Sequence, residues 1–176
     1  MTMNPELVDV LPAHQFDEDS LRAWLQQAIP GFGTKLDVQQ FQGGQSNPTF
    51  LLDTDSGQYV LRKKPPGKTL PSAHMVEREY KVMRALSEHT SVPVPATRAL
   101  CEDSSIIGTP FYVMDYLEGR IVSHPALRAL DRQERMSAHR SAIDTLAALH
   151  SVDVNQIGLG DYGRPEGYVA RQVSRW

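Results

Sequence analysis

The sequence predicts an α+β fold in which one helix lies across an antiparallel sheet. Short apolar runs rich in β-branched and aromatic residues, separated by turn residues, predict five strands near residues 37–41, 49–53, 59–62, 97–101 and 111–116. A segment with helical spacing of apolar residues interrupts them at residues 72–88, where Ser72 can cap the helix. The order strand, strand, strand, helix, strand, strand is typical of an antiparallel sheet with a helix packed on one face.

The N-terminal 36 residues precede this sheet unit. We interpret the first fifteen as a loose lead-in. Apolar residues then follow with helical spacing from Asp17 to Ala28, and Pro30-Gly31 ends that helix. We therefore expect a lead-in and one helix at residues 1–36, ahead of a sheet unit at residues 37–117.

The segment Phe41–Lys64 contains an unusual turn. Two glycines, which let a backbone approach a ligand closely, are combined with hydrogen-bonding side chains in Gly43, Gly44, Gln45, Ser46 and Asn47. The strand that follows Asp55-Ser56-Gly57, a hairpin turn, ends on three cations, Arg62, Lys63 and Lys64. A turn beside a cationic strand suits a polyphosphate. An ordinary hairpin turn explains the same residues, and they leave both interpretations open.

The helix at residues 72–88 carries a carboxylate on its apolar stripe. Helical angles place Glu79 within the stripe formed by Val76, Tyr80, Met83 and Leu86. Glu77, Arg78 and Lys81 point away from it. A carboxylate on a buried stripe is costly without a cation, and the available cations are Arg62 and its neighbours on the third strand. Strand alternation turns Lys63 to the opposite face of the sheet. The alternative is that Glu79 lies at the edge of the stripe and reaches water.

A long helix is predicted from Asp131 to His150. Its apolar face contains Met136, Ile143, Leu146 and Ala147, and His150 falls on the same face. We interpret His150 as a packed core residue. The other histidines and Cys101 have no metal-ligand spacing, and no hydrolase motif is present.

Composition narrows the function classes. The chain of 176 residues is 40% apolar and 22% charged, as is ordinary for a globular protein, and its net charge of −3 gives no electrostatic reason to expect nucleic acid or an anionic membrane as a partner. A single cysteine excludes an internal disulfide and suits a reducing compartment. We find no signal peptide and no apolar run of about 18 residues, and so expect a cytoplasmic protein.

Several segments, in order, resemble the N-terminal part of the aminoglycoside phosphotransferase family, in the branch related to acyl-CoA dehydrogenase family 10 and 11 proteins. They are FQGGQSN, YVLRKKPPG, EREY, VPVP, GTPFYVMDYLEGR and GLGDYGRPEGYVARQVSRW. The resemblance runs from Phe41 to Trp176. It implies the protein-kinase-like fold shared with choline kinases: a small lobe of about five antiparallel strands and one helix at residues 37–117, then the hinge exit and the first helices of an incomplete large lobe at residues 118–176.

The resemblance also implies an ATP site. The turn at residues 43–47 corresponds to the nucleotide-positioning loop, with Ser46 and nearby amides on the phosphates. Arg62 stands where the family has a phosphate-contacting lysine, and Glu79 is the helix carboxylate that pairs with it. Arginine keeps the charge, but its fork is bulkier than an ammonium. The adenine would bind the backbone of Asp115, Tyr116 and Leu117, next to a gatekeeper, Met114.

The catalytic motif of the family is not found in the sequence. A kinase of this fold needs an Asp to position the acceptor hydroxyl, an Asn and a second Asp for magnesium. Gly160-Asp161-Tyr162 imitates the family's His-Gly-Asp loop, but Leu159 precedes it and no Asn follows nearby. We therefore expect the catalytic Asp and the Mg²⁺ ligands beyond Trp176. The chain would be the nucleotide-binding half of a longer kinase, with no turnover of its own.

Three functions are compatible with these features. The first is an ATP-dependent phosphotransferase that acts on a hydroxyl group of a metabolite, with a hydroxyacyl-CoA-type acceptor. The second is an aminoglycoside antibiotic phosphotransferase. The third is a non-catalytic nucleotide-binding or regulatory module.

Overall fold

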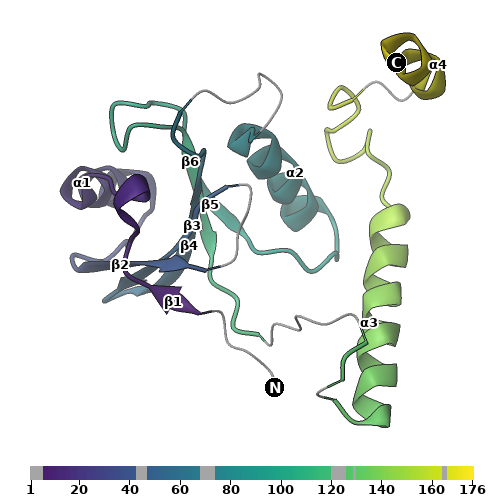
Figure 1. The fold of residues 1–176 in the computed structure, drawn as a ribbon, viewed down its shortest axis with the longest axis horizontal. Coiled ribbons are helices and arrows are strands. Elements are labelled where there is room, and N and C mark those ends of the chain that lie inside the picture. Colours follow the sequence, from purple (N-terminus) through teal and green to yellow (C-terminus); the bar gives the residue numbers. More distant parts are fainter. Residues whose placement is uncertain (1–5, 43–46, 68–73, 120–125, 129, 164–165) are drawn as a thin grey trace.

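A six-stranded antiparallel sheet forms the centre of the molecule (Figure 1). The computed structural model describes residues 6–42, 47–67, 74–119, 126–128, 130–163 and 166–176. In spatial order the strands are β1 (Leu7–Val8), β2 (Leu36–Phe41), β3 (Thr49–Thr54), β4 (Gly57–Lys63), β6 (Phe111–Asp115) and β5 (Thr97–Cys101). The five predicted strands are confirmed, and β1 adds a sixth.

The N-terminal segment is part of this sheet, so its interpretation as a loose lead-in is wrong. Leu7 and Val8 pair with Phe41 and Gln40 at the edge of β2. A strand of two residues is too short to show any apolar alternation, which is why the sequence did not indicate it. A short 3₁₀ helix, Pro12–His14, then leads to α1.

Helix α1 (Glu18–Ala28) covers one face of the sheet. Asp17 caps it by accepting hydrogen bonds from the amides of Asp19 and Ser20. Its buried stripe packs against the side chains that alternate strand residues direct to this face, and together they form the main core: Leu21, Leu25, Phe50, Leu52, Leu61, Phe111 and Val113. Cys101 belongs to the same core and is 3% exposed. Burial raises the pKa of its thiol.

Helix α2 (Val76–His89) lies on the opposite face (Figure 1). Val76 and Leu86 of the predicted stripe are buried, and Tyr80 packs edge-on against Tyr112, with ring centroids 6.1 Å apart. The helix begins four residues later than predicted. Met75 occupies the N-cap position without a side-chain cap, and the expected cap, Ser72, lies outside the described residues.

The predicted C-terminal helix is present as α3 (Arg132–His150), which begins with a capping box between Asp131 and Glu134. A short helix, α4 (Tyr168–Arg175), follows. The apolar face of α3 is open to solvent, with Met136 64% and Ile143 65% exposed. His150 is exposed as well, so its interpretation as a core residue is wrong. Among the described residues, packing reaches only the C-terminal end of α3, where Ala148 contacts the cluster around Leu86 and Ile157.

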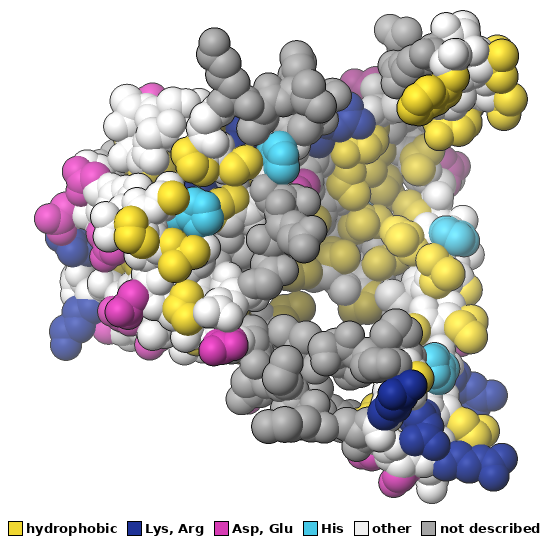
Figure 2. All heavy atoms as spheres, in the orientation of Figure 1, with side chains coloured by type: hydrophobic (Ala, Val, Ile, Leu, Met, Phe, Trp, Pro, Cys, Tyr) yellow, Lys and Arg dark blue, Asp and Glu magenta, His cyan; other side chains and the backbone are white. Residues whose placement is uncertain are grey.

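Hydrophobic side chains gather along α3 and in the hollow between α3 and α2 (Figure 2). The hollow contains an open groove of about 440 Å³, lined almost wholly by apolar side chains of α2, the end of α3 and residues 152–163. Within the described ranges, no helix combines the length and apolarity needed to cross a membrane.

Candidate functional site

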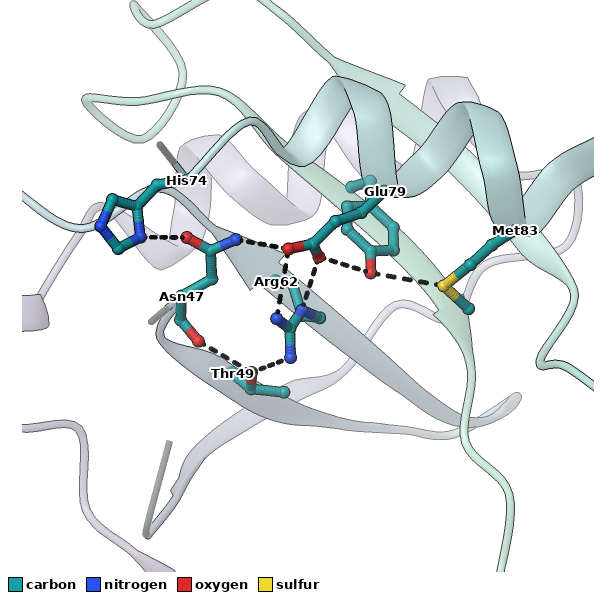
Figure 3. Close-up of polar contacts among 7 residues, drawn as sticks. Asn47, Thr49, Arg62, His74, Glu79 and Met83 are labelled. Atoms are coloured by element: carbon teal, nitrogen blue, oxygen red, sulfur yellow. Dashed lines mark hydrogen bonds and ion pairs between the residues drawn. The ribbon is translucent and has the colours of Figure 1, made fainter. Parts of the chain in front are cut away.

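Arg62 and Glu79 form the centre of the site, on the face of the sheet that carries α2 (Figure 3). Arg62 comes near the end of β4, and Glu79 comes from the first turn of α2. The Arg62 Nε atom lies 3.0 Å from Glu79 Oε2, and Nη2 lies 3.4 Å from Oε1. Both side chains are about one third exposed, at 28% and 35%. The predicted ion pair is therefore confirmed.

Two further donors hold the Glu79 carboxylate. Asn47 Nδ2 donates to Oε1 at 2.8 Å, and the Tyr112 hydroxyl donates to Oε2 at 3.2 Å. Each carboxylate oxygen thus accepts two hydrogen bonds. Burial, together with the nearby charge of Glu79, raises the pKa of Tyr112 well above its ordinary value, so the phenol stays protonated and remains a donor.

The guanidinium of Arg62 has N–H groups that remain available to a ligand. Its Nη1 donates to Thr49 Oγ1 at 3.2 Å, and Thr49 Oγ1 donates in turn to the carbonyl of Asn47 at 3.1 Å. A guanidinium has five N–H donors. Three of those on Arg62 have partners among the described residues, which leaves two. A fixed guanidinium with unused donors is well suited to a phosphate group.

The predicted nucleotide-positioning turn is described only at its last residue, Asn47. Asn47 is 2% exposed and points into the site. Gly43, Gly44, Gln45 and Ser46 lie outside the described residues, so their assignment to ATP phosphates stays a prediction.

The predicted hinge follows β6. Met114 pairs with Val60 of β4 and lies on the same face as Arg62, because residues two apart in a strand share a face. The Asp115 carboxylate binds Arg98 at 2.6 and 2.7 Å. The amide of Asp115 donates to Ala96 and that of Tyr116 to Gln58. Within the described part of the chain, the amide of Leu117 has no such partner, and the assignment of residues 114–117 to an adenine stays a prediction.

The two lysines that follow Arg62 do not contact Glu79 but have other partners. Lys63 faces α1, as predicted, and its Nζ donates to the carbonyl of His14 at 2.8 Å, with the Phe16 ring centroid 4.8 Å away. Burial lowers the pKa of Lys63. Lys64 pairs with Glu77. Glu77 was expected only to point away from the stripe. It is instead a half-buried partner of Lys64, which lies two residues after Arg62 and so on the same side of the sheet as α2.

Asp161, which imitates a catalytic aspartate in the sequence, binds α2 instead. Its Oδ1 lies 2.9 Å from Lys81 Nζ, and this hydrogen bond lowers the pKa of Asp161. The adjacent Tyr162 stacks under Arg78, with the guanidinium carbon 4.1 Å from the ring centroid, and its carbonyl accepts from Arg78 Nη2 at 3.1 Å. The loop therefore connects to the outer side of α2. In the described chain, no group of three or more His, Cys, Asp or Glu residues could hold a metal ion.

Three side chains of this site were not predicted from the sequence: Thr49, His74 and Tyr112. Tyr112 lies directly opposite Arg62 in the β4–β6 register. Strand alternation from Met114 would have placed it on the correct face. His74 contacts Asn47 across 27 positions of sequence, and no local pattern signals that contact.

Residues 37–176 match the model of a family described as the phosphotransferase enzyme family. The chain belongs to this phosphotransferase family. Among its relatives is acyl-CoA dehydrogenase family member 11 of Rattus norvegicus, 47% identical over 180 residues that cover 100% of this chain and 23% of the relative. Family member 10 of Mus musculus is 42% identical over 160 residues, covering 90% of this chain and 15% of the relative. The chain thus spans less than a quarter of these relatives' length.

A solved structure from Ralstonia eutropha, described as a candidate aminoglycoside phosphotransferase, matches with a TM-score of 0.78 and 44% identity. The match covers 92% of this phosphotransferase-family chain and 46% of the solved chain. This chain therefore has the protein-kinase-like fold. Its homologues include the kinase-like region of the acyl-CoA dehydrogenase family 10 and 11 proteins.

Proposed function

We propose that this chain is the nucleotide-binding half of an ATP-dependent small-molecule kinase, which transfers a phosphoryl group to a hydroxyl group of a metabolite. The observation that carries the proposal is the Arg62–Glu79 pair, 3.0 Å apart, with two guanidinium N–H groups left for a phosphate. Membership of the phosphotransferase family supports the same reading.

Each part of the site takes one part of ATP in this proposal. Ser46 and the amides of residues 43–47 bind phosphate oxygens, and Arg62 binds the α/β-phosphates while Glu79 holds it in place. Met114 borders the adenine, which binds the backbone of residues 115–117. ATP supplies the phosphoryl group. Because the sequence has no His-Gly-Asp loop with a downstream Asn, we place the Mg²⁺ ligands and the catalytic Asp beyond Trp176.

We also propose how the chain divides. Residues 37–117 are the small lobe, the described part of residues 1–36 adds β1 to its sheet and packs α1 on it, and residues 118–176 start the large lobe. This division follows the change from sheet to helices after β6.

For the acceptor we favour a hydroxyacyl-CoA-type metabolite, because relatives covering this whole chain are named as acyl-CoA dehydrogenase family members. An aminoglycoside is the second candidate, favoured by the description of the solved structure from Ralstonia eutropha. ATP consumption by the complete gene product, measured with each acceptor class in parallel, distinguishes the two.

The nucleotide site itself can be tested by calorimetric titration of the protein with ATP and magnesium. Arg62→Gln removes the phosphate-binding cation, and we expect the dissociation constant to rise roughly tenfold or more, as for loss of a charge-assisted hydrogen bond. The matched control is Arg84→Gln, because Arg84 pairs with Glu88 on the exposed side of α2. Equal affinities of wild type and Arg62→Gln would reject the assignment.

A further inference from the structure

We propose that His74 is a positioning residue for this site: by donating a hydrogen bond to Asn47, it fixes the amide that holds Glu79 on Arg62. The functional consequence rests on the nucleotide site proposed above. His74 Nδ1 lies 3.1 Å from Asn47 Oδ1, and Asn47 Nδ2 lies 2.8 Å from Glu79 Oε1 (Figure 3). The chain of contacts runs from His74 through Asn47 to the ion pair.

The direction of each hydrogen bond in this chain follows from the carboxylate. Ionised Glu79 can only accept, so the side of the Asn47 amide that faces it must be the NH₂ group. The amide oxygen then faces His74. Since an amide oxygen can only accept, His74 must carry its proton on Nδ1. A neutral ring protonated on Nδ1 and a charged ring both satisfy all three residues, whereas a neutral ring protonated only on Nε2 does not.

Burial makes this orientation matter. Asn47 is 2% exposed, so water cannot easily replace a lost partner of its oxygen. The Asn47 amide has two possible orientations, related by exchange of its oxygen and its NH₂ group. Without the His74 donor, these two orientations would differ less in energy. In the flipped orientation the Asn47 oxygen would face the Glu79 carboxylate, which would repel it. His74 therefore keeps a donor pointed at Glu79.

The backbone at His74 gives independent support. Its φ of 59° lies in the left-handed region, which residues other than glycine seldom adopt. Such a conformation persists where the surroundings require it. The residue lies just before α2, and Asn47 lies just before β3. The contact thus joins the start of the helix that carries Glu79 to the strand beside Arg62.

Two substitutions separate the side chain from the backbone. His74→Asn places an amide NH₂ where the imidazole has Nδ1, and asparagine tolerates positive φ. His74→Gly also tolerates positive φ but has no donor. We expect His74→Asn to bind ATP with magnesium as tightly as wild type, and His74→Gly to bind roughly five- to tenfold more weakly. A His74→Gly protein with wild-type affinity, or a His74→Asn protein as weak as His74→Gly, would overturn the proposal.

A second measurement needs no nucleotide. Long-range ¹H–¹⁵N correlation spectra at about pH 8, where an ordinary imidazole is neutral, identify which ring nitrogen carries the proton. We expect the Nδ1–H tautomer for His74. The Nε2–H tautomer would overturn the inference whatever the affinity for ATP. An Nδ1–H tautomer in a protein that fails to bind ATP would support the His74–Asn47 contact and reject the proposed function instead.

Discussion

Three consecutive cations at the end of β4 have three different environments. Arg62 faces α2 and meets Glu79, Lys63 faces α1 and enters the core, and Lys64 pairs with Glu77. Strand alternation turns Lys63 to the α1 face, and it leaves Arg62 and Lys64, two residues apart, on the α2 face beside different carboxylates. Substitutions at these neighbours should therefore have unlike effects.

Glu79→Gln tests the ion pair. The substitution keeps the shape of the side chain but removes the charge that positions Arg62. In the complete enzyme we expect the apparent constant for ATP to rise roughly tenfold and turnover to fall. The control is Glu77→Gln, which breaks only the pair with Lys64. It should leave the ATP constant unchanged while lowering the free energy of unfolding, because Lys64 is then partly buried without its partner. Equal effects of both substitutions on ATP would contradict the assignment.

Lys63 should make stability depend on pH. Burial lowers its pKa in the folded state, whereas the unfolded chain has an ordinary lysine. Between the two pKa values the unfolded state binds more protons, so the free energy of unfolding should rise with pH up to about 10.5. Lys63→Met lacks this contribution. Denaturant titrations of both proteins from neutral pH upward should show a wild-type minus Lys63→Met difference that increases with pH; a flat difference would contradict the expectation.

At the scale of elements, α2 is held from two sides. Its inner side packs on β5 and β6 and carries Glu79, and its outer side receives Lys81–Asp161 and Arg78–Tyr162 from the loop after α3. Any displacement of α2 would change both sets of contacts together. The loop at residues 160–163 is thus part of the support for Glu79.

Asp161→Asn distinguishes such support from catalysis. Loss of a general base typically lowers turnover by a factor on the order of 10² to 10⁴. Since Lys81 binds Asp161 and lowers its pKa, we expect turnover of the complete gene product to stay within about threefold of wild type, well short of the loss of a base. Lys81→Gln, which breaks the same pair from the other side, should behave alike. A hundredfold loss confined to Asp161→Asn would make Asp161 catalytic.

The helices and strands could be predicted from the sequence because apolar residues recur in it with helical or strand spacing. The contacts between these elements could not be predicted in this way. Helical angles placed Glu79 toward the sheet and strand alternation excluded Lys63, and the family resemblance then selected Arg62 as its partner. Residues that complete the site depend on where loops bring distant residues. Asn47 reaches Glu79 from 32 positions away, and Tyr112 reaches it from 33. The exposure of His150 depends on what packs against α3, which no pattern within the helix reports.

The molecule as a whole combines a sheet unit that carries the candidate nucleotide site with a helix, α3, whose apolar face is exposed. The sheet has a core on the α1 face and the candidate site on the α2 face. The α3 face and the adjoining groove remain open. We expect the 176-residue chain to be sufficient for ATP binding and the complete gene product to be required for turnover.

An ATP-consumption assay can show that separation. We expect the 176-residue chain to bind ATP but to give no measurable turnover with any acceptor, because its sequence has no His-Gly-Asp loop with a downstream Asn. The complete gene product, assayed in parallel, is the positive control. Turnover by the short chain that disappears in Asp161→Asn would overturn both the assignment of roles and the proposed division of the chain.

The single cysteine makes it possible to measure opening of the sheet and displacement of α2. Cys101 is 3% exposed in the core, and burial raises the pKa of its thiol, so little reactive thiolate is available in the folded protein. Thiol reagents should modify it only when the sheet opens, and the modification rate then reports the free energy of that opening. For the same reason, a cysteine introduced at an exposed position such as Lys81 or Ser141 could be labelled selectively without removing the native one. A fluorophore at Lys81 would follow α2 as ATP binds.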